Sequence, residues 1–133
     1  MARILIIDDD EILAEIVVDA LASAGHLVSA VHHGHQAIRA VDESGPELII
    51  LDYDLPGVTG LEILRQIRRR PYGPGLPVLM LTATTSRLLP ARAHRDDIDD
   101  YLVKPVALDL LVGRVEALLR SAALSKQVSH TTP

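Results

Sequence analysis

The chain has 133 residues, which is enough for one domain with its own hydrophobic core and too few for two ordinary domains. Hydrophobic residues make up 48% of it and charged residues 23%, a balance typical of a globular protein and not of a disordered one. The formal net charge is -5 and there is no Phe or Trp to stack on bases, so direct binding of nucleic acid by this domain is not expected.

The sequence also limits the compartment. It contains no cysteine, which excludes disulfides and thiol chemistry and fits a reducing environment. The N-terminal stretch "MARILIIDDDE" reaches acidic residues after only a few apolar ones, unlike a signal peptide. No apolar run approaches the length of a membrane span. A cytoplasmic location without membrane association is therefore expected.

Short apolar segments alternate with longer amphipathic segments along the chain. The apolar segments, each expected to form a strand, are 3–8, 26–31, 47–52, 77–82 and 100–103. The amphipathic segments, each expected to form a helix, are 11–25, 34–44, 59–70, 86–95 and 107–121. Runs such as "ILII" and "LIIL" lack polar alternation, as in strands buried on both faces. This alternation predicts an α/β fold with one open parallel sheet between two layers of helices.

The last residues differ in character from the rest. The sequence "SKQVSHTTP" (125–133) is polar and shows no helical or strand periodicity. We therefore expect the domain to cover residues 1–121 and residues 122–133 to form a polar tail or the start of a linker.

Polar side chains stand where four of the five predicted strands end. They are Asp8 and Asp9 after the first strand, Asp52 after the third, Thr82 after the fourth and Lys104 after the fifth. The carboxyl ends of parallel strands share one edge of the sheet, which is where sites form in such folds. We therefore expect three carboxylates, a hydroxyl and an ammonium group to lie close together, which packing of the core does not require.

The residue types in this cluster indicate phosphoryl chemistry. Three carboxylates in a small pocket repel one another unless a cation compensates them. Mg²⁺ suits such a site, because it takes one or two carboxylates and leaves positions for water and phosphate oxygens. Lys104 and Thr82 add a positive charge and a hydroxyl donor for a transferring phosphoryl group. Asp52 can then act as a nucleophile and form an aspartyl-phosphate.

The order and spacing of these motifs resemble the receiver domains of two-component response regulators over about residues 2–121. The resemblance is carried by the pair Asp8-Asp9, by "LDYDLPGVTG" (51–60), by "LTA" (81–83) and by "DYLVKP" (100–105). It implies a flavodoxin-like three-layer (βα)5 fold with the strand order 2-1-3-4-5. It also implies a phosphoprotein that acts as a switch in a phosphorelay and takes phosphate from a sensor histidine kinase.

The resemblance implies a role for each residue. Asp52 is the phosphoacceptor, and it binds Mg²⁺ together with Asp9 and the backbone carbonyl of Asp54, while Asp8 acts largely through water. The side chain of Asp54 is expected to face the entrance of the site. Lys104 contacts the phosphoryl oxygens. Thr82 moves to donate to one of them, and Tyr101 follows as the second switch residue. Such a domain is not an enzyme for other substrates and catalyses only its own phosphorylation and dephosphorylation.

The end of the last predicted helix indicates an output. "LLVGRVEALLRS" (110–121) resembles receivers that precede winged-helix DNA-binding domains, in which phosphorylation favours a symmetric dimer. Asp96, Asp100 and Arg114 stand where some of the charged partners of that dimer are, while other positions carry residues that cannot pair. The resemblance therefore implies a weak, phosphorylation-dependent homodimer.

A different class of protein also fits part of the pattern. "DYDLPG" (52–57) resembles the D-x-D motif of haloacid-dehalogenase-like phosphatases, which would use Asp52 and Asp54. Those enzymes need a further acidic pair after the Lys to hold Mg²⁺. Beyond Lys104 the sequence offers only Asp109 and Glu116, both within a predicted helix. The receiver is therefore the favoured interpretation, with the phosphatase as the alternative.

Three other clusters have simpler interpretations. "HHGH" (32–35) is dense in metal ligands, but it follows a strand and contains a turn-forming Gly, so an exposed loop is favoured over a zinc site. "RDDIDDY" (95–101) lacks the ligand spacing of a calcium loop and is expected to form a solvated or interface surface. "RRR" (68–70) ends a predicted helix, where cations favour the C-terminal carbonyls.

Overall fold

The structure, a computed structural model, describes residues 1–83 and 98–131, with side chains as far as residue 125. Five parallel strands form one sheet in the order β2-β1-β3-β4-β5. The strands are β1 (Arg3–Ile7), β2 (Leu27–Val31), β3 (Leu48–Asp52), β4 (Val78–Thr82) and β5 (Asp100–Val103). The helices are α1 (Glu11–Ser23), α2 (Ala37–Ser44), α3 (Gly60–Arg68) and α5 (Leu108–Thr131), with short 3-10 turns η1 (Gly34–Gln36) and η2 (Gly73–Gly75).

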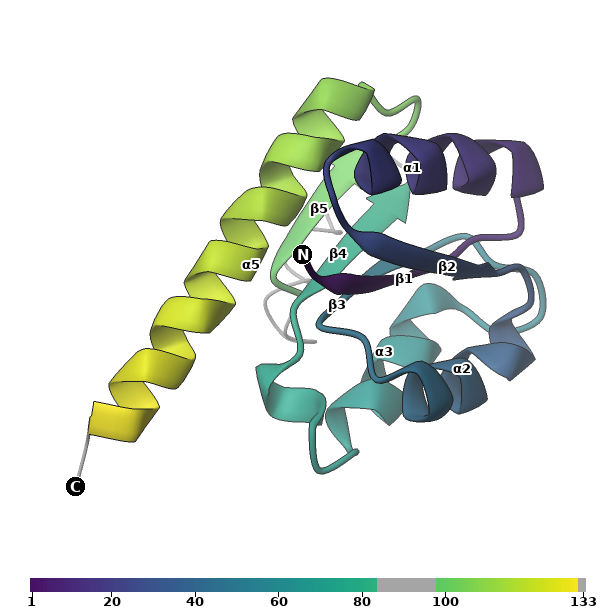
Figure 1. Ribbon diagram of the computed structural model, residues 1–133. Helices are drawn as coiled ribbons and strands as arrows, with labels where there is room; N and C mark the ends of the chain where they lie inside the picture. The colour runs from purple at the N-terminus through teal and green to yellow at the C-terminus, as the bar shows by residue number, and fades with distance from the viewer. Residues whose placement is uncertain (84–97, 132–133) are drawn as a thin grey trace.

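The helices lie in two layers on either side of the sheet. Figure 1 shows α1 and α5 on one face and α2 and α3 on the other. The flavodoxin-like fold and the strand order 2-1-3-4-5 are therefore confirmed. The helix expected over 86–95 lies outside the described residues. None of the described helices has the length and apolar character needed to cross a membrane.

The last helix is longer than the sequence indicates. The helix expected over 107–121 continues to Thr131, so most of the segment expected to be a polar tail is helical. In Figure 1 the yellow end of α5 extends away from the sheet. Adding residues to a helix that is already packed costs little, because each added residue gains a hydrogen bond without a new nucleation step. The expected domain boundary at residue 121 stays a prediction.

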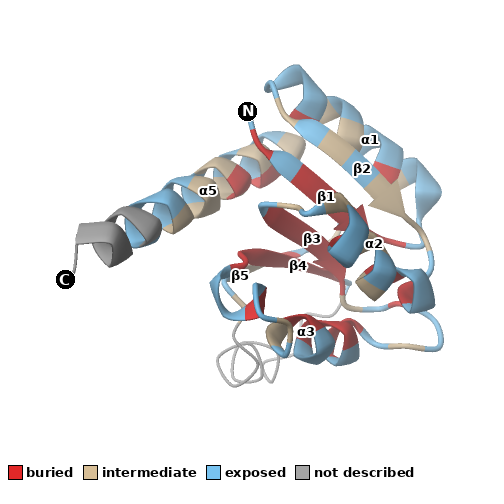
Figure 2. Ribbon diagram, turned by 60° about the horizontal axis from the view of Figure 1, so that its bottom comes forward, coloured by how far each residue is buried: buried red, intermediate tan, exposed pale blue. Residues whose placement is uncertain are grey.

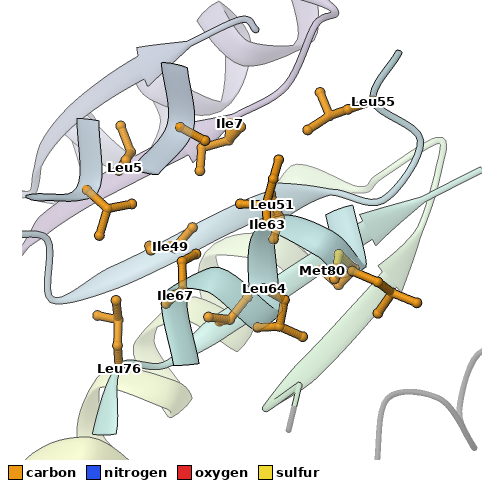
Figure 3. Packing of buried hydrophobic residues seen from close by; sticks show 14 residues of the cluster. Leu5, Ile7, Ile49, Leu51, Leu55, Ile63, Leu64, Ile67, Leu76 and Met80 are labelled. Atoms are coloured by element: carbon orange, nitrogen blue, oxygen red, sulfur yellow. The ribbon is translucent and has the colours of Figure 1, made fainter. Parts of the chain in front are cut away.

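Alternate residues of the strands pack against the two helix layers. Leu5 and Ile7 of β1 face α2 and α3, whereas Ile4 and Ile6 face α1 and α5. All residues of β3 and β4 are buried, as expected for central parallel strands (Figure 2). Figure 3 shows how Leu and Ile side chains of α3 fill the space beside β3. Each fully buried aliphatic side chain contributes about 1.5–3 kcal/mol, so this core holds the strand ends in fixed positions.

Two local signals fix the loops that carry the acidic residues. The Asp10 carboxylate caps α1 by accepting from the Leu13 N–H at 3.0 Å. The role of this carboxylate is therefore structural, unlike the metal-binding role expected of Asp8 and Asp9. Gly60 begins α3 directly behind the end of β3. A Cβ at this position would lie 2.6 Å from the Asp52 carbonyl oxygen, so only glycine lets the helix approach so closely.

Candidate functional site

Within the part of the chain that the structure describes, the buried polar residues are Asp8, Asp52 and Thr82. All three stand at the carboxyl edge of the sheet, on β3 and β4 and just after β1. Lys104, directly after β5, is half-buried beside them, and its Nζ lies 3.1 Å from Asp8 Oδ2 and 3.4 Å from Asp52 Oδ1. The structure thus brings together the strand-end side chains that the sequence predicts.

The acidic residues outnumber the cation beside them. Asp8, Asp9 and Asp52 each offer a carboxylate oxygen, and these atoms lie within 4.8 Å of one another. Asp8 and Asp52 are buried and Asp9 is exposed, so the group opens to solvent on one side. Asp8 Oδ2 is buried and has no hydrogen-bond donor among the described residues, although Lys104 is near it. A hard divalent cation would satisfy this oxygen and offset the surplus negative charge, so the residues present fit such an ion.

Burial and charge shift the proton affinities of two of these groups. Burial is the main cause that raises the pKa of Asp52 from 3.8 to about 7, and the neighbouring charge of Asp8 adds to it. The Asp54 N–H and the Lys104 charge oppose this increase. Burial acts to lower the pKa of Lys104, but the charges of Asp8 and Asp52 outweigh it and the pKa is raised. Lys104 is therefore a permanent cation, and it compensates only part of the acidic charge.

The sequence analysis expected the side chain of Asp54 to face the entrance of the site. In the structure this side chain also makes hydrogen bonds at the end of β4. Although the residue is exposed, its Oδ2 accepts hydrogen bonds from the Ala83 N–H at 2.9 Å and from the Thr82 hydroxyl at 3.4 Å. Its N–H donates to Asp52 Oδ1 at 3.0 Å. The expected role of its carbonyl as a metal ligand stays a prediction. The two donors lie 28 and 29 residues later in the sequence, at the end of β4 and just after it, which sequence spacing alone does not indicate.

His32 supports the site and was missed by the sequence analysis. The Asp8 carbonyl accepts a hydrogen bond from His32 Nδ1 at 3.0 Å, and the Asp8 N–H donates to the Val31 carbonyl at 3.1 Å. These two bonds fasten the end of β1 to the end of β2. His33 and His35 are exposed, as predicted, and their rings stack at 5.8 Å. In the described parts of the chain, the acidic residues form the one cluster of three or more potential metal ligands.

The second predicted switch residue, Tyr101, lies on β5, next to the strand that carries Thr82. Tyr101 on β5 is opposite Met80 of β4, is half-buried, and packs against the core on the α2 and α3 side. Its movement on phosphorylation stays a prediction.

The acidic stretch 95–101 forms specific pairs where the structure describes it. Asp99 pairs with Arg68 at the end of α3, and Asp100 pairs with Arg114 of α5. Arg68 also donates to the carbonyls of Gly73 and Leu76, beyond the helix. The stretch is thus tied to the fold and is not merely a solvated surface. Residues 95–97 lie outside the described part.

With this geometry, the chain can be placed in a family. A family model described as the response regulator receiver domain matches residues 4–116. The chain belongs to the response regulator receiver domain family of two-component systems.

Among characterised relatives, the chain is similar to two transcriptional regulators. It is 37% identical over 122 residues to the phosphate regulon transcriptional regulatory protein PhoB of Rhizobium meliloti, an alignment that covers 92% of this chain and 54% of that protein. It is 39% identical over 118 residues to the DNA-binding response regulator MtrA of Mycolicibacterium paratuberculosis, covering 89% of this chain and 51% of that one. The chain thus spans about half the length of the relatives it matches.

Solved structures agree with the fold. NtrX from Brucella abortus superimposes with a TM-score of 0.88 at 29% identity, over 96% of this chain and 29% of that one. The chemotaxis protein CheY4 of Vibrio cholerae superimposes with a TM-score of 0.84 at 27% identity, over 89% of this chain and 98% of that one.

The phosphatase alternative gains no support from the two acids after Lys104. The Asp109 carboxylate accepts from the N–H of its neighbour Leu110, and Glu116 pairs with His26. Neither joins the group of three acidic residues at the carboxyl edge of the sheet. A second acidic pair for Mg²⁺ is therefore not present at this site among the described residues, and the family match also favours the receiver.

Proposed function

We propose that the chain is a phosphoacceptor switch that receives a phosphoryl group on Asp52 from a sensor histidine kinase, with Mg²⁺ as cofactor. The observation that carries the proposal is the partly buried acidic cluster, which has more carboxylates than cations beside it. Three carboxylates lie within 4.8 Å of one another, with the single ammonium group of Lys104 beside Asp8 and Asp52. A site with this surplus charge is suited to bind a divalent cation and, through it, a phosphate.

Each residue contributes to the transfer by position or charge. Asp8, Asp9 and Asp52 would hold Mg²⁺, which supplies charge neutralisation for the phosphoryl oxygens and for the attacking carboxylate. An oxygen of Asp52 forms the new bond to phosphorus as the bond between phosphorus and the donor breaks, and the electron pair of that bond leaves with the donor. Lys104 stabilises negative charge on the transferring group, and the Thr82 hydroxyl and the Ala83 N–H offer hydrogen bonds to its oxygens.

On this proposal the domain catalyses only its own modification. Burial raises the pKa of Asp52, and a bound cation would favour its ionised form, which is the nucleophile. Phosphorylation of Asp52 would change the charge and the hydrogen bonding at the carboxyl edge of the sheet. Thr82 and Tyr101 would respond to that change and bias the surface of β5 and α5 toward a second state.

A transcriptional output is also part of the proposal, because the relatives named above are transcriptional regulators about twice as long as this chain. The expected homodimer stays a prediction. Arg114 Nη1 lies 2.8 Å and 2.7 Å from the two carboxylate oxygens of Asp100, within one chain. A dimer that used these charges between subunits would have to share or exchange this pair. Asp96 lies outside the described residues.

The experiment is covalent labelling with acetyl phosphate and Mg²⁺. The intact mass should rise by one phosphoryl group that is labile to base, and Asp52→Asn should abolish the increase. Asp19→Asn removes a carboxylate from the exposed side of α1 and should leave the label unchanged. Label that persists in Asp52→Asn would refute the assignment. Repeated turnover of a simple phosphomonoester would instead support the phosphatase.

A further inference from the structure

The carboxylate of Asp54 already occupies hydrogen-bond donors at the end of β4. A single oxygen, Oδ2, lies 2.9 Å from the Ala83 nitrogen and 3.4 Å from Thr82 Oγ1. This places a fourth acidic side chain at an edge that already carries surplus negative charge, two residues from Asp52. Like charges so close are unfavourable unless hydrogen bonds offset the repulsion. The two donors from β4 supply such bonds.

These donors also stand where a phosphoryl group on Asp52 would meet them. Asp52 lies opposite Leu81 in the pairing of β3 and β4, so Thr82 and Ala83 are the next residues beyond it on the neighbouring strand. A phosphoryl oxygen is an anionic acceptor, as is a carboxylate oxygen, and both form strong hydrogen bonds to backbone N–H and hydroxyl groups. The Ala83 N–H has one hydrogen to donate and cannot serve both acceptors fully.

We propose that Asp54 is an internal competitor for the phosphoryl group: in the unmodified chain its carboxylate takes the hydrogen bonds of Ala83 and Thr82, and phosphorylation of Asp52 displaces it. This inference rests on the function proposed above. It gives the unmodified state its own set of bonds at the site. The phosphoryl group therefore gains only the difference between its own contacts and those of Asp54.

A simpler role for the same bonds is to fasten the loop after β3 to the end of β4. The two roles differ in what they predict. If Asp54 only fastens the loop, its removal should loosen the site and weaken the binding of a phosphoryl mimic. If Asp54 competes, its removal should strengthen that binding, because the phosphoryl mimic no longer has to displace the Asp54 carboxylate.

The experiment is a titration of beryllofluoride in the presence of Mg²⁺, followed by the amide NMR signal of Ala83, for the unaltered chain, Asp54→Ala and Asp54→Asn. Asp54→Ala should bind about tenfold more tightly, which corresponds to about 1.4 kcal/mol. Asp54→Asn should fall between the other two, since its amide oxygen still accepts but carries no charge. In the absence of the mimic, the Ala83 amide should exchange faster with solvent in Asp54→Ala.

The matched control is Glu11→Gln. Glu11 is an exposed acid at the start of α1, and its Oε1 lies 3.8 Å from His32 at the same edge of the sheet. Among the described residues, no hydrogen bond of Thr82 or Ala83 to Glu11 is observed. Its removal should change beryllofluoride affinity by less than about twofold.

Two results would overturn the inference: affinity that is unchanged or weaker in Asp54→Ala, or an equal gain in Glu11→Gln, which would show a general effect of charge. Either result leaves the proposed function intact if Asp52 still takes the label from acetyl phosphate. If the unaltered chain takes no label and binds no beryllofluoride, the proposed function fails and the inference fails with it.

Discussion

The polar side chains at the amino and carboxyl ends of the sheet differ in how fully they are paired within the protein. At the amino end, Arg68 donates to the carbonyls of Gly73 and Leu76 and pairs with Asp99, which in turn accepts from the first N–H of β4. At the carboxyl end, Asp8 keeps a buried oxygen without a hydrogen-bond donor in the described structure, and the pKa of Asp52 rises to about 7.

A second group of polar residues at the amino end, around His26, is also hydrogen-bonded within the protein. His26 Nδ1 accepts from the Ala2 N–H at 3.0 Å, so its proton is on Nε2, which lies 2.5 Å from Glu116 of α5. The ring thereby ties the start of β1 to the last helix, and it is nearly buried, with 7% of its side chain exposed. Polar groups that satisfy one another stabilise the fold, whereas the acids of the carboxyl edge, of which Asp8 and Asp52 share the cation of Lys104, are available for a ligand.

The largest effect is expected at the amino end. Arg68→Ala should lower the free energy of unfolding by about 3 kcal/mol, because it removes one donor from each of two loop carbonyls and the cation from the Asp99 carboxylate. Urea denaturation without Mg²⁺ would measure it. Arg39→Ala breaks only an exposed pair with Glu43 and should leave the unfolding midpoint unchanged. Equal effects of the two changes would contradict the comparison.

At the carboxyl end, removing a charged side chain should stabilise the fold instead of destabilising it. Asp52→Asn should raise the free energy of unfolding of the metal-free protein above pH 7 by about 1–3 kcal/mol, because it removes one of several crowded carboxylates while Lys104 keeps Asp8. Since burial raises the pKa of Asp52 from 3.8 to about 7, the folded state binds the proton more tightly than the unfolded one. Its contribution to stability is therefore complete below pH 4 and is lost as the pH rises through 7.

Urea denaturation at several pH values, in the presence of a chelator, would measure this dependence. The unaltered protein should lose stability between about pH 4 and 7 relative to Asp52→Asn. Asp19→Asn, which removes an exposed charge from α1, should follow the unaltered protein. A destabilised Asp52→Asn would mean that the carboxylate is well compensated even without a metal.

Most of the fold follows from local patterns, while several contacts of the site do not. The apolar runs predict all five strands, and the residue that ends each run predicts Asp8, Asp52, Thr82 and Lys104 at one edge. The strand order, by contrast, came from the resemblance to receivers. The helical segment after residue 121 was missed because its composition is polar, and helix propagation is decided by the residues that precede it.

The contacts of Asp54, Asp99 and His32 could not be predicted because their partners are distant in sequence. Ala83 is 29 residues from Asp54, Arg68 is 31 from Asp99, and Asp8 is 24 from His32. Each contact depends on which strand ends lie next to one another. Sequence periodicity gives the ends of the strands, but the neighbours at an edge are known only once the sheet is assembled.

The central claim is that the surplus acids at the carboxyl edge hold a divalent cation, and calorimetric titration with Mg²⁺ tests it most directly. Asp9→Asn should weaken Mg²⁺ binding at least about tenfold, whereas His33→Ala combined with His35→Ala should change it less than about twofold. Binding by the unaltered protein should also weaken as the pH falls below about 7, because Asp52 must be ionised to act as a ligand. Undiminished binding by Asp9→Asn, with loss of binding in the double histidine variant, would contradict the account.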